Sequence, residues 1–267
     1  MLSIPAFLKG RFGGATRWQE VLRAARRTPY YREFRLNDLN EADPVSIGQF
    51  RKQPGLFRNP LAADEALCEF EHPQTPPPKT LLLEGGFRQA SGLLISASGW
   101  SAELTEFGPG SLAAAAHRLM PLAMSRSRPK LTHSIVAFVG PEFGALTPED
   151  RDLLWTCFGV PVYEQLRGLG RELLAAECDA HEGLHIREED AIFEEGDELL
   201  VTSLTNLWNP VLRLRTGLRG KITTKLCGCG ETGKRLIEVE RISNEQPAIA
   251  TPPAIRRSNS PLTPDLP

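Results

Sequence analysis

The stretch from Cys178 to Arg235 constrains the fold of this chain most, because it gathers residue types that bind metal ions. It contains three of the five cysteines and two of the five histidines of the chain. Cys227 and Cys229 form a Cys-Gly-Cys-Gly knuckle, in which the glycines leave the backbone free to curl. Structural zinc takes four thiolate or imidazole ligands in a closed tetrahedron. The sequence therefore predicts that one zinc ion joins Cys178 and a histidine to the distant knuckle.

The histidine ligand has two candidates, His181 and His185. The segment 179–183 is polar and contains a glycine, which predicts the turn of a β-hairpin. Residues that flank such a turn face each other across two strands, so Cys178 is expected opposite His185, with His181 in the turn as the competing ligand. The residues alone also allow a cysteine cluster without an ion, or a disulfide.

Length and charge exclude several classes of protein. A chain of 267 residues can bury a sizeable core, as one large domain or two small ones. The net charge of −2 gives no bulk attraction to nucleic acid or to a membrane surface. No apolar run spans a bilayer, the first ten residues lack the core of a signal peptide, and the cysteine pattern is no disulfide framework. We expect a cytoplasmic protein that binds neither nucleic acid nor membranes.

The first 78 residues are predicted to form a helical and proline-rich N-terminal region. Apolar residues at helical spacing predict a helix over Thr16–Arg27, and a serine cap starts a second over Ser46–Gln53. Prolines then recur up to the run Pro76-Pro77-Pro78, which predicts an extended connector and a boundary.

Residues 79–242 are predicted to form an α/β core with a mixed sheet, followed from about residue 173 by a mostly antiparallel, β-rich half. Alanine-rich Ser111–Met120 predicts a helix, and Thr147 caps another helix that ends at Gly159. The order of strand, helix and strand favours a right-handed crossover between parallel strands. The segments predicted as strands are 79–84, 92–97, 134–139, 160–163, 198–202, 211–215, 220–225 and 235–239. The proline-rich tail, 243–267, is expected to be disordered.

Several motifs of the second half occur in a recognisable order: Val160-Pro161-Val162-Tyr163-Glu164-Gln165, Gly183-Leu184-His185, Arg213-Leu214-Arg215-Thr216-Gly217 and Cys227-Gly228-Cys229-Gly230. In this order they resemble the phenylacetate–CoA ligase branch of the acyl-adenylate-forming (AMP-binding) enzymes, and the match covers residues 147–240. The resemblance implies an adenylation domain that activates an aryl or acyl carboxylate with ATP and Mg²⁺ and passes it to CoA. It also implies zinc on Cys178, His185, Cys227 and Cys229.

The same resemblance marks what the chain lacks. The family's phosphate loop corresponds best to 96–101, which has no Thr-Thr-Gly and no following lysine. The family's Tyr-Gly-x-Thr-Glu motif for adenine and magnesium is here the segment 166–170, Leu-Arg-Gly-Leu-Gly, and Leu218 replaces the aspartate that holds the ribose hydroxyls. Glu164, Glu172 and Arg215 are the remaining nucleotide-binding candidates. We expect no C-terminal lid domain, because the chain ends in the loose tail.

These departures predict a degenerate homologue that does not adenylate and that acts as a binding or accessory protein. Zinc is then the expected cofactor, and the departures argue against ATP, Mg²⁺ and CoA. The expected partner is a small aryl or acyl ligand or another protein. Two alternatives stay open: an active acyl- or aryl-CoA ligase whose missing parts are supplied otherwise, and a zinc-stabilised interaction domain.

Arg213 and Arg215 lie two apart on a predicted strand, so both side chains are expected on one face. A solvated face, salt bridges to Glu188–Asp190 or a remnant anion site would each explain them.

Overall fold

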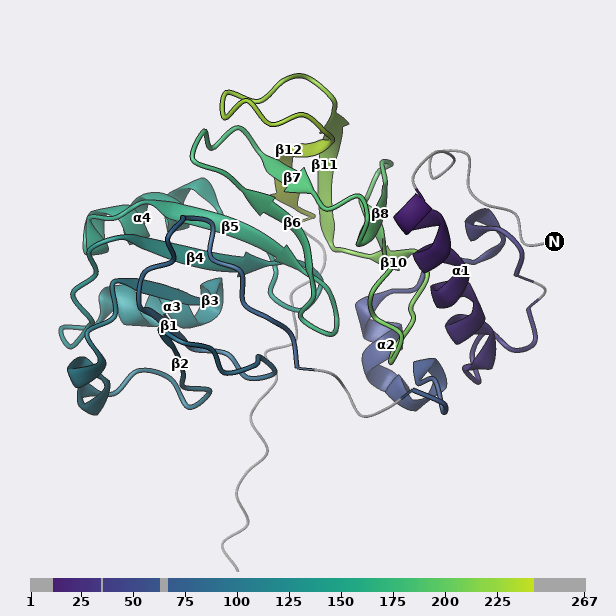
Figure 1. The fold of residues 1–267 in the computed structure, drawn as a ribbon, viewed down its shortest axis with the longest axis horizontal. Coiled ribbons are helices and arrows are strands. Elements are labelled where there is room, and N and C mark those ends of the chain that lie inside the picture. Colours follow the sequence, from purple (N-terminus) through teal and green to yellow (C-terminus); the bar gives the residue numbers. More distant parts are fainter. Residues whose placement is uncertain (1–11, 35, 63–66, 243–267) are drawn as a thin grey trace, which may run out of the picture.

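The structure of the protein is a computed structural model that describes residues 12–34, 36–62 and 67–242. The tail expected to be disordered, 243–267, lies outside these residues. Nine of the described strands form one mixed sheet in the order β11-β12-β7-β6-β5-β4-β3-β1-β2, and three form a second sheet in the order β10-β9-β8. Figure 1 shows α3 and α4 against one end of the large sheet, while α1 and α2 lie beside the small sheet.

The large sheet contains β1 (Thr80–Leu82), β2 (Leu93–Ile95), β3 (Ser111–Ala115), β4 (Ser134–Val139), β5 (Val162–Arg167), β6 (Leu173–Glu177), β7 (Leu184–Ile186), β11 (Leu218–Thr223) and β12 (Arg235–Arg241). The small sheet contains β8 (Ala191–Glu194), β9 (Leu200–Ser203) and β10 (Leu214–Arg215). The α-helices are α1 (Phe12–Arg27), α2 (Ile47–Lys52), α3 (Ala116–Met124) and α4 (Pro148–Phe158). Shorter 3-10 helices are η2 (Leu39–Glu41), η3 (Pro54–Phe57) and η4 (Ala102–Phe107).

The pairing of the strands divides the chain as predicted. Strands β1 to β5 pair only in parallel with one another, with α3 and α4 as crossovers between β3, β4 and β5. From β5 onward the pairs β5–β6, β6–β7, β7–β12 and β11–β12 are antiparallel, as are the pairs of the small sheet. The predicted mixed α/β fold with an antiparallel second half is confirmed.

The prediction of a helix over Ser111–Met120 is wrong in its first half. Residues Ser111–Ala115 form strand β3, which lies between β1 and β4 and is buried along its whole length. The helix begins only at Ala116. Alanine prefers a helix by less than 1 kcal/mol per residue over most residue types, so hydrogen bonding to two neighbouring strands in a buried parallel sheet outweighs that preference.

The two faces of the parallel sheet are covered differently. Ile135, Ala137 and Val139 of β4 pack into the large core that includes the helical residues Leu119 and Leu154. The alternate β4 residues face a second, aromatic cluster, in which the Phe138 ring centroid lies 5.6 Å from that of Phe87.

The segment 68–74 lies across this second face of the sheet. Gln165 of β5 donates a hydrogen bond from its Nε2 to the Glu71 carbonyl at 2.7 Å, and the His72 Nε2 lies 3.2 Å from the buried Ser134 Oγ. Part of the proline-rich segment therefore covers the sheet and does more than connect two regions.

The N-terminal helices pack on the small sheet. Trp18 and Tyr31 are fully buried in the large core, together with Val201 and Leu212 of the second half. The Tyr31 hydroxyl accepts a hydrogen bond from the Leu212 N–H at 3.0 Å and lies 3.3 Å from the Leu212 carbonyl. Among the described residues, no helix combines the length and the apolar character needed to cross a bilayer.

Candidate metal centre and the turn between β5 and β6

Two hairpins bring the cysteine and histidine clusters together. Strand β12 pairs with β7 so that Arg235 lies opposite His185, which sets the β11–β12 loop beside the β6–β7 turn. The β6–β7 hairpin depends on Gly183, whose φ of 108° is in the region that favours glycine. Because Gly183 has no side chain, the Leu236 carbonyl can approach its Cα closely. The expected pairing of Cys178 with His185 is wrong, because His185 lies opposite Ala176 and Cys178 is the first residue of the turn.

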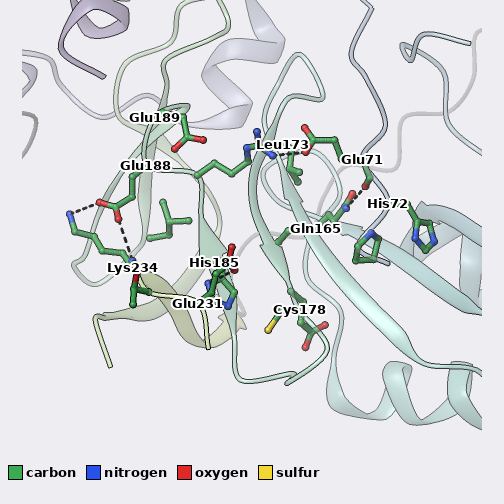
Figure 2. Close-up of a pocket in the computed structure, with 17 residues that line it drawn as sticks. Glu71, His72, Gln165, Leu173, Cys178, His185, Glu188, Glu189, Glu231 and Lys234 are labelled. Atoms are coloured by element: carbon green, nitrogen blue, oxygen red, sulfur yellow. Dashed lines mark hydrogen bonds and ion pairs between the residues drawn. The ribbon is translucent and has the colours of Figure 1, made fainter. Parts of the chain in front are cut away.

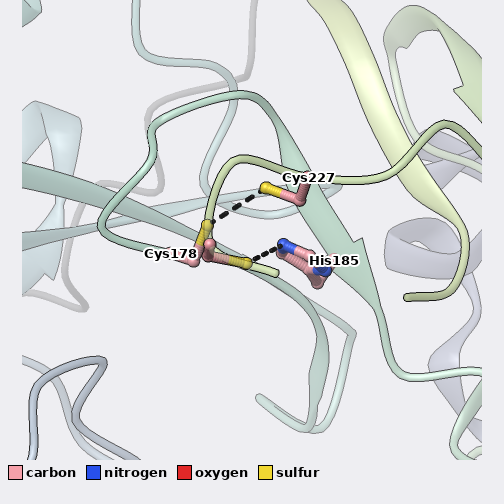
Figure 3. A group of neighbouring side chains, drawn as sticks. Cys178, His185 and Cys227 are labelled. Carbon is pink, nitrogen blue, oxygen red and sulfur yellow. Dashed lines mark hydrogen bonds between the residues drawn. The ribbon is translucent and has the colours of Figure 1, made fainter. Parts of the chain in front are cut away.

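Four side chains nevertheless converge, and Figure 3 shows Cys178, Cys227 and His185 among them. One ligand atom from each of Cys178, His185, Cys227 and Cys229 lies within 4.8 Å of the others. The Sγ atoms of Cys178 and Cys227 are 3.6 Å apart, and the Cys229 Sγ is 3.5 Å from the His185 Nε2. A tetrahedral zinc site has sulfur–sulfur edges of about 3.8 Å and sulfur–nitrogen edges of about 3.5 Å, given zinc–sulfur bonds of about 2.3 Å. The donor set and its spacing fit one such ion.

The thiols of this cluster are not joined by a disulfide. All five cysteines are free, and a 3.6 Å sulfur separation is far longer than the disulfide bond length of about 2.05 Å. Burial raises the pKa of the Cys178 thiol to about 12, and the neighbouring thiols Cys227 and Cys229 also raise it. A divalent cation that binds here must displace such protons, which is the usual coupling between metal binding and deprotonation.

His181 has a different environment from His185. Its Nδ1 lies 3.2 Å from the Glu177 carboxylate, and its ring centroid is 5.0 Å from that of Tyr163. The structure thus brings His185 to the three cysteines and leaves His181 outside the cluster.

Polar groups around the cluster hold the knuckle to the turn. The Glu182 carboxylate accepts a hydrogen bond from the Gly228 N–H at 2.9 Å. The buried Arg235 guanidinium donates to the Glu182 carbonyl on one side and to the Lys225 carbonyl on the other. Glu231 lies 3.3 Å from the His185 Nδ1. The two halves of the cluster are therefore tied together by groups other than its four ligands.

A pocket of about 660 Å³ opens beside the cluster, and Cys178 and His185 form part of its wall (Figure 2). Five glutamates and two cationic side chains line it: Glu71, Glu177, Glu188, Glu189, Glu231, Arg187 and Lys234. Both cations are paired with carboxylates, Arg187 with Asp190 at 2.9 Å and Lys234 with Glu188 at 3.4 Å. The lining is therefore negative on balance.

The last residue of β5, immediately before the turn to β6, is the fully buried Arg167. The Arg167 guanidinium carbon lies 5.0 Å from the Phe138 ring centroid and 5.3 Å from that of Phe87. One of its nitrogens donates to the Arg171 carbonyl at 3.1 Å and another to the Gln165 side chain. Burial lowers the pKa of Arg167 to about 10, so the group stays charged at neutral pH inside an aromatic cage.

The turn that follows Arg167 is closely packed. A side chain on Gly168 would collide with the Glu172 carboxyl, and one on Gly170 would come within 3.0 Å of both Asn206 and Glu172. The cavity left between these residues has a volume of about 10 Å³. The Glu172 Oε2 is buried in the described structure without a hydrogen-bond partner, and burial raises the pKa of this carboxyl.

The remaining nucleotide-binding candidates lie in separate places. Glu164 of β5 points to α4, where it forms an ion pair with Arg151, and burial raises the pKa of the Glu164 carboxyl. Arg215 forms an ion pair with Glu198 at 2.8 Å. Leu218 is buried in the large core.

The two arginines of the predicted strand pair with different acids than expected. Arg213 has a φ of 51°, and β10 begins only at Leu214. Arg213 and Arg215 are therefore not two residues of one regular strand, as the prediction of a shared face required. The Arg213 Nε lies 3.0 Å from Glu194, while Arg215 pairs with Glu198, so the expected partners in 188–190 are wrong.

The loop 96–101 is a turn. The Ser96 hydroxyl donates to the Gly99 carbonyl at 2.7 Å. Ser101 precedes η4, a 3-10 helix, and its side chain makes no capping hydrogen bond.

Sequence reasoning missed Arg167, Glu231 and Glu182. An arginine is surface-exposed by default, so nothing in the sequence marks Arg167 as buried. Glu231 did carry a signal, because a carboxylate two residues after Cys229 is well placed to contact a metal-ligating histidine.

No family model and no curated protein matches this chain. Solved structures of a 2-hydroxyisobutyryl-CoA ligase do match. Its complex with 2-HIB-AMP and CoA in the thioesterification state has a TM-score of 0.62 and 15% identity, over 90% of this chain and 69% of that one. Its open conformation has a TM-score of 0.58 and 14% identity, over 83% of this chain and 72% of that one. The chain therefore has the mixed α/β fold of the AMP-forming acyl-CoA ligases.

Proposed function

We propose that this protein is a degenerate relative of the phenylacetate–CoA ligase branch that does not adenylate and that acts as a binding or accessory protein. The observation that carries the proposal is the closed β5–β6 turn. The resemblance assigns adenine and magnesium binding to segment 166–170, and the cavity beside that segment has a volume of only about 10 Å³. This volume holds about one water molecule, whereas ligand pockets typically measure about 300–1,000 Å³.

Arg167 supports the proposal because it occupies the position of the family's glycine with a large side chain. Its guanidinium packs against the stacked rings of Phe138 and Phe87 on the face of the sheet that segment 68–74 covers. Opening this face for a nucleotide would require moving a buried charge away from its aromatic and carbonyl partners. Breaking such buried polar contacts costs several kcal/mol.

The chemistry of the remaining candidates also argues against adenylation. A magnesium ligand must be an ionised carboxylate, yet the raised pKa of Glu172 favours its neutral form. Glu164 is neutralised by Arg151 of α4, and Leu218 offers no hydrogen-bond acceptor for a ribose. The 660 Å³ pocket is large enough for a small ligand, but its glutamate lining repels a triphosphate.

We further propose one zinc ion on Cys178, His185, Cys227 and Cys229. Four protein ligands leave no open position, so the ion is structural and stabilises the junction of the β6–β7 turn with the β11–β12 loop. The junction of the β6–β7 turn with the β11–β12 loop, together with the adjoining pocket, is the proposed binding surface for an aryl or acyl ligand or for a partner protein.

ATP–pyrophosphate exchange tests the absence of adenylation. Full-length protein is assayed with phenylacetate, benzoate and fatty acids, beside an active acyl-CoA ligase that shows the assay works. The expected result is exchange at the level of the enzyme-free blank. Exchange that is abolished both by Glu172→Ala and by Arg215→Ala would overturn the proposal and make the protein an active ligase.

A further inference from the structure

We infer that Glu231 positions His185 as a metal ligand through its Nε2 atom, an inference that rests on the proposed zinc site. The ring of His185 lies between two groups. Its Nε2 is 3.5 Å from the Cys229 Sγ, inside the ligand cluster, and its Nδ1 is 3.3 Å from the Glu231 carboxylate, outside it. The two nitrogens therefore face different partners.

The role of Glu231 follows from the two tautomers of neutral imidazole. Only the nitrogen without a proton can bind a metal, and the other nitrogen then carries the hydrogen. A carboxylate accepts a hydrogen bond but cannot donate one when ionised, so Glu231 holds the proton on Nδ1. This leaves the Nε2 lone pair directed at the three sulfur atoms.

Glu231 also contacts a second ligand of the cluster. Its backbone N–H donates to the Cys229 Sγ at 3.4 Å, and such a bond stabilises a thiolate more than a thiol. Gly230, with a φ of 85°, and the bond from its N–H to the Cys227 carbonyl at 2.9 Å shape the turn that makes this contact possible. One residue thus orients both the histidine and the exposed cysteine.

Other charged groups near the cluster have other tasks. Lys234 pairs with Glu188, and Glu182 accepts from the Gly228 N–H, which fixes the knuckle backbone but no ligand ring. The Glu231 side chain is 68% exposed, so water competes with it and its effect belongs at the low end of the 10- to 100-fold range for such residues.

The experiment measures zinc affinity of the full-length protein by competition with a chromogenic chelator. The variants are Glu231→Ala, Glu231→Gln and Glu240→Ala. Glu240 is a matched control, because it is 61% exposed and pairs with Arg219 on the β11–β12 hairpin away from the cluster. We expect Glu231→Ala to weaken zinc binding about 10-fold, Glu231→Gln to weaken it less because the amide oxygen still accepts from Nδ1, and Glu240→Ala to have no effect.

Two spectroscopic measurements separate positioning from general stability. Long-range ¹H–¹⁵N spectra of the zinc-loaded wild type should show His185 with its proton on Nδ1. The ligand-field bands of the Co²⁺ form should shift in Glu231→Ala but not in Glu240→Ala. If the wild type binds neither zinc nor Co²⁺, both the proposed metal site and the inference about Glu231 are wrong. If the wild type binds metal and Glu231→Ala binds it equally well, or if His185 carries its proton on Nε2, only the inference about Glu231 is wrong.

Discussion

The Sγ atom of Cys178 lies 3.6 Å from that of Cys227, although the two residues are 49 positions apart in the sequence. The distance matches an edge of a tetrahedral zinc–thiolate site, and two hairpins that are neighbours in the sheet but distant in the sequence provide the two sulfur atoms. A metal bound here links segments that otherwise meet through a few hydrogen bonds, and its removal is the first test of the site.

Replacing Cys227 by serine should lower both zinc content and thermal stability. Cys227 is buried and provides one of four ligands, and a metal that binds only the folded state stabilises it by mass action. Free zinc at 1,000 times its Kd adds about 4 kcal/mol to the free energy of unfolding in this way. Calorimetry in zinc and in excess chelator measures the difference between wild type and variant.

Cys157→Ser is the control for this prediction, since Cys157 lies on α4 outside the cluster. The chelator should lower the melting temperature of wild type and Cys157→Ser but leave Cys227→Ser unchanged. A wild type that does not respond to the chelator contradicts a structural metal.

Arg167→Ala should destabilise the protein by about 3 kcal/mol, because it removes a buried group that contacts three aromatic rings and leaves the Gln165 Oε1 without its hydrogen-bond donor. Arg167→Met should cost less, since an apolar side chain of similar length fills the same cage. Urea denaturation of the three proteins gives the free energies of unfolding. If Arg167→Ala and wild type have the same free energy of unfolding, the buried contacts of Arg167 do not hold the β5–β6 turn closed.

Glu172→Gln should gain stability relative to wild type as the pH rises. Burial raises the pKa of Glu172 above its ordinary value of 4.5. At a pH between the unfolded and the folded pKa, the folded state therefore holds a proton that the unfolded state has released. The stability contributed by this proton is full below pH 4.5 and is lost as the pH rises through the folded pKa, by at most about 1.4 kcal/mol per pH unit. Glutamine does not titrate and keeps its stability.

The measurement is urea denaturation of wild type and Glu172→Gln at several pH values between about 4 and 8. This range begins just below the ordinary pKa of 4.5 and extends well above it. Glu103→Gln, at an exposed position of η4, is the matched control and should show a flat difference. A flat difference for Glu172→Gln as well means that this carboxyl ionises normally in the folded state.

Leu218→Asp restores the family's residue but should not restore adenylation. Leu218 is buried in the core, so an aspartate there is expected to destabilise the protein by about 3 kcal/mol. Leu226→Asp, at a position that is 68% exposed, should be nearly neutral. Thermal denaturation and pyrophosphate exchange test both parts, and exchange gained by Leu218→Asp alone contradicts the expectation.

The sequence predicted those parts of the fold whose local signals agree with their surroundings. Strand Ser134–Val139 was predicted with its observed bounds, because a β-branched run ends at Gly140-Pro141. The caps of Ser46 and Thr147 were also confirmed, since each bonds to the backbone three residues on. Ser111–Ala115 was predicted wrongly, because only its place between two strands makes it a strand.

The candidate site was predictable to a similar degree. Cysteine and histidine chemistry predicted the three clustered cysteines with either His181 or His185, and the family resemblance favoured His185, but the hairpin register that also supported His185 was wrong by two residues. The buried Arg167 and the cover of the sheet by 68–74 depend on long-range packing, for which neither segment has a local signal.

Calorimetric titration of the full-length protein with Mg²⁺–ATP tests the central claim, that the segment assigned to the nucleotide is closed. We expect no saturable heat up to millimolar ATP, which corresponds to a binding free energy weaker than about −4 kcal/mol. Binding of one ATP per chain with a Kd well below 1 mM, lost in Glu172→Ala, would contradict the account.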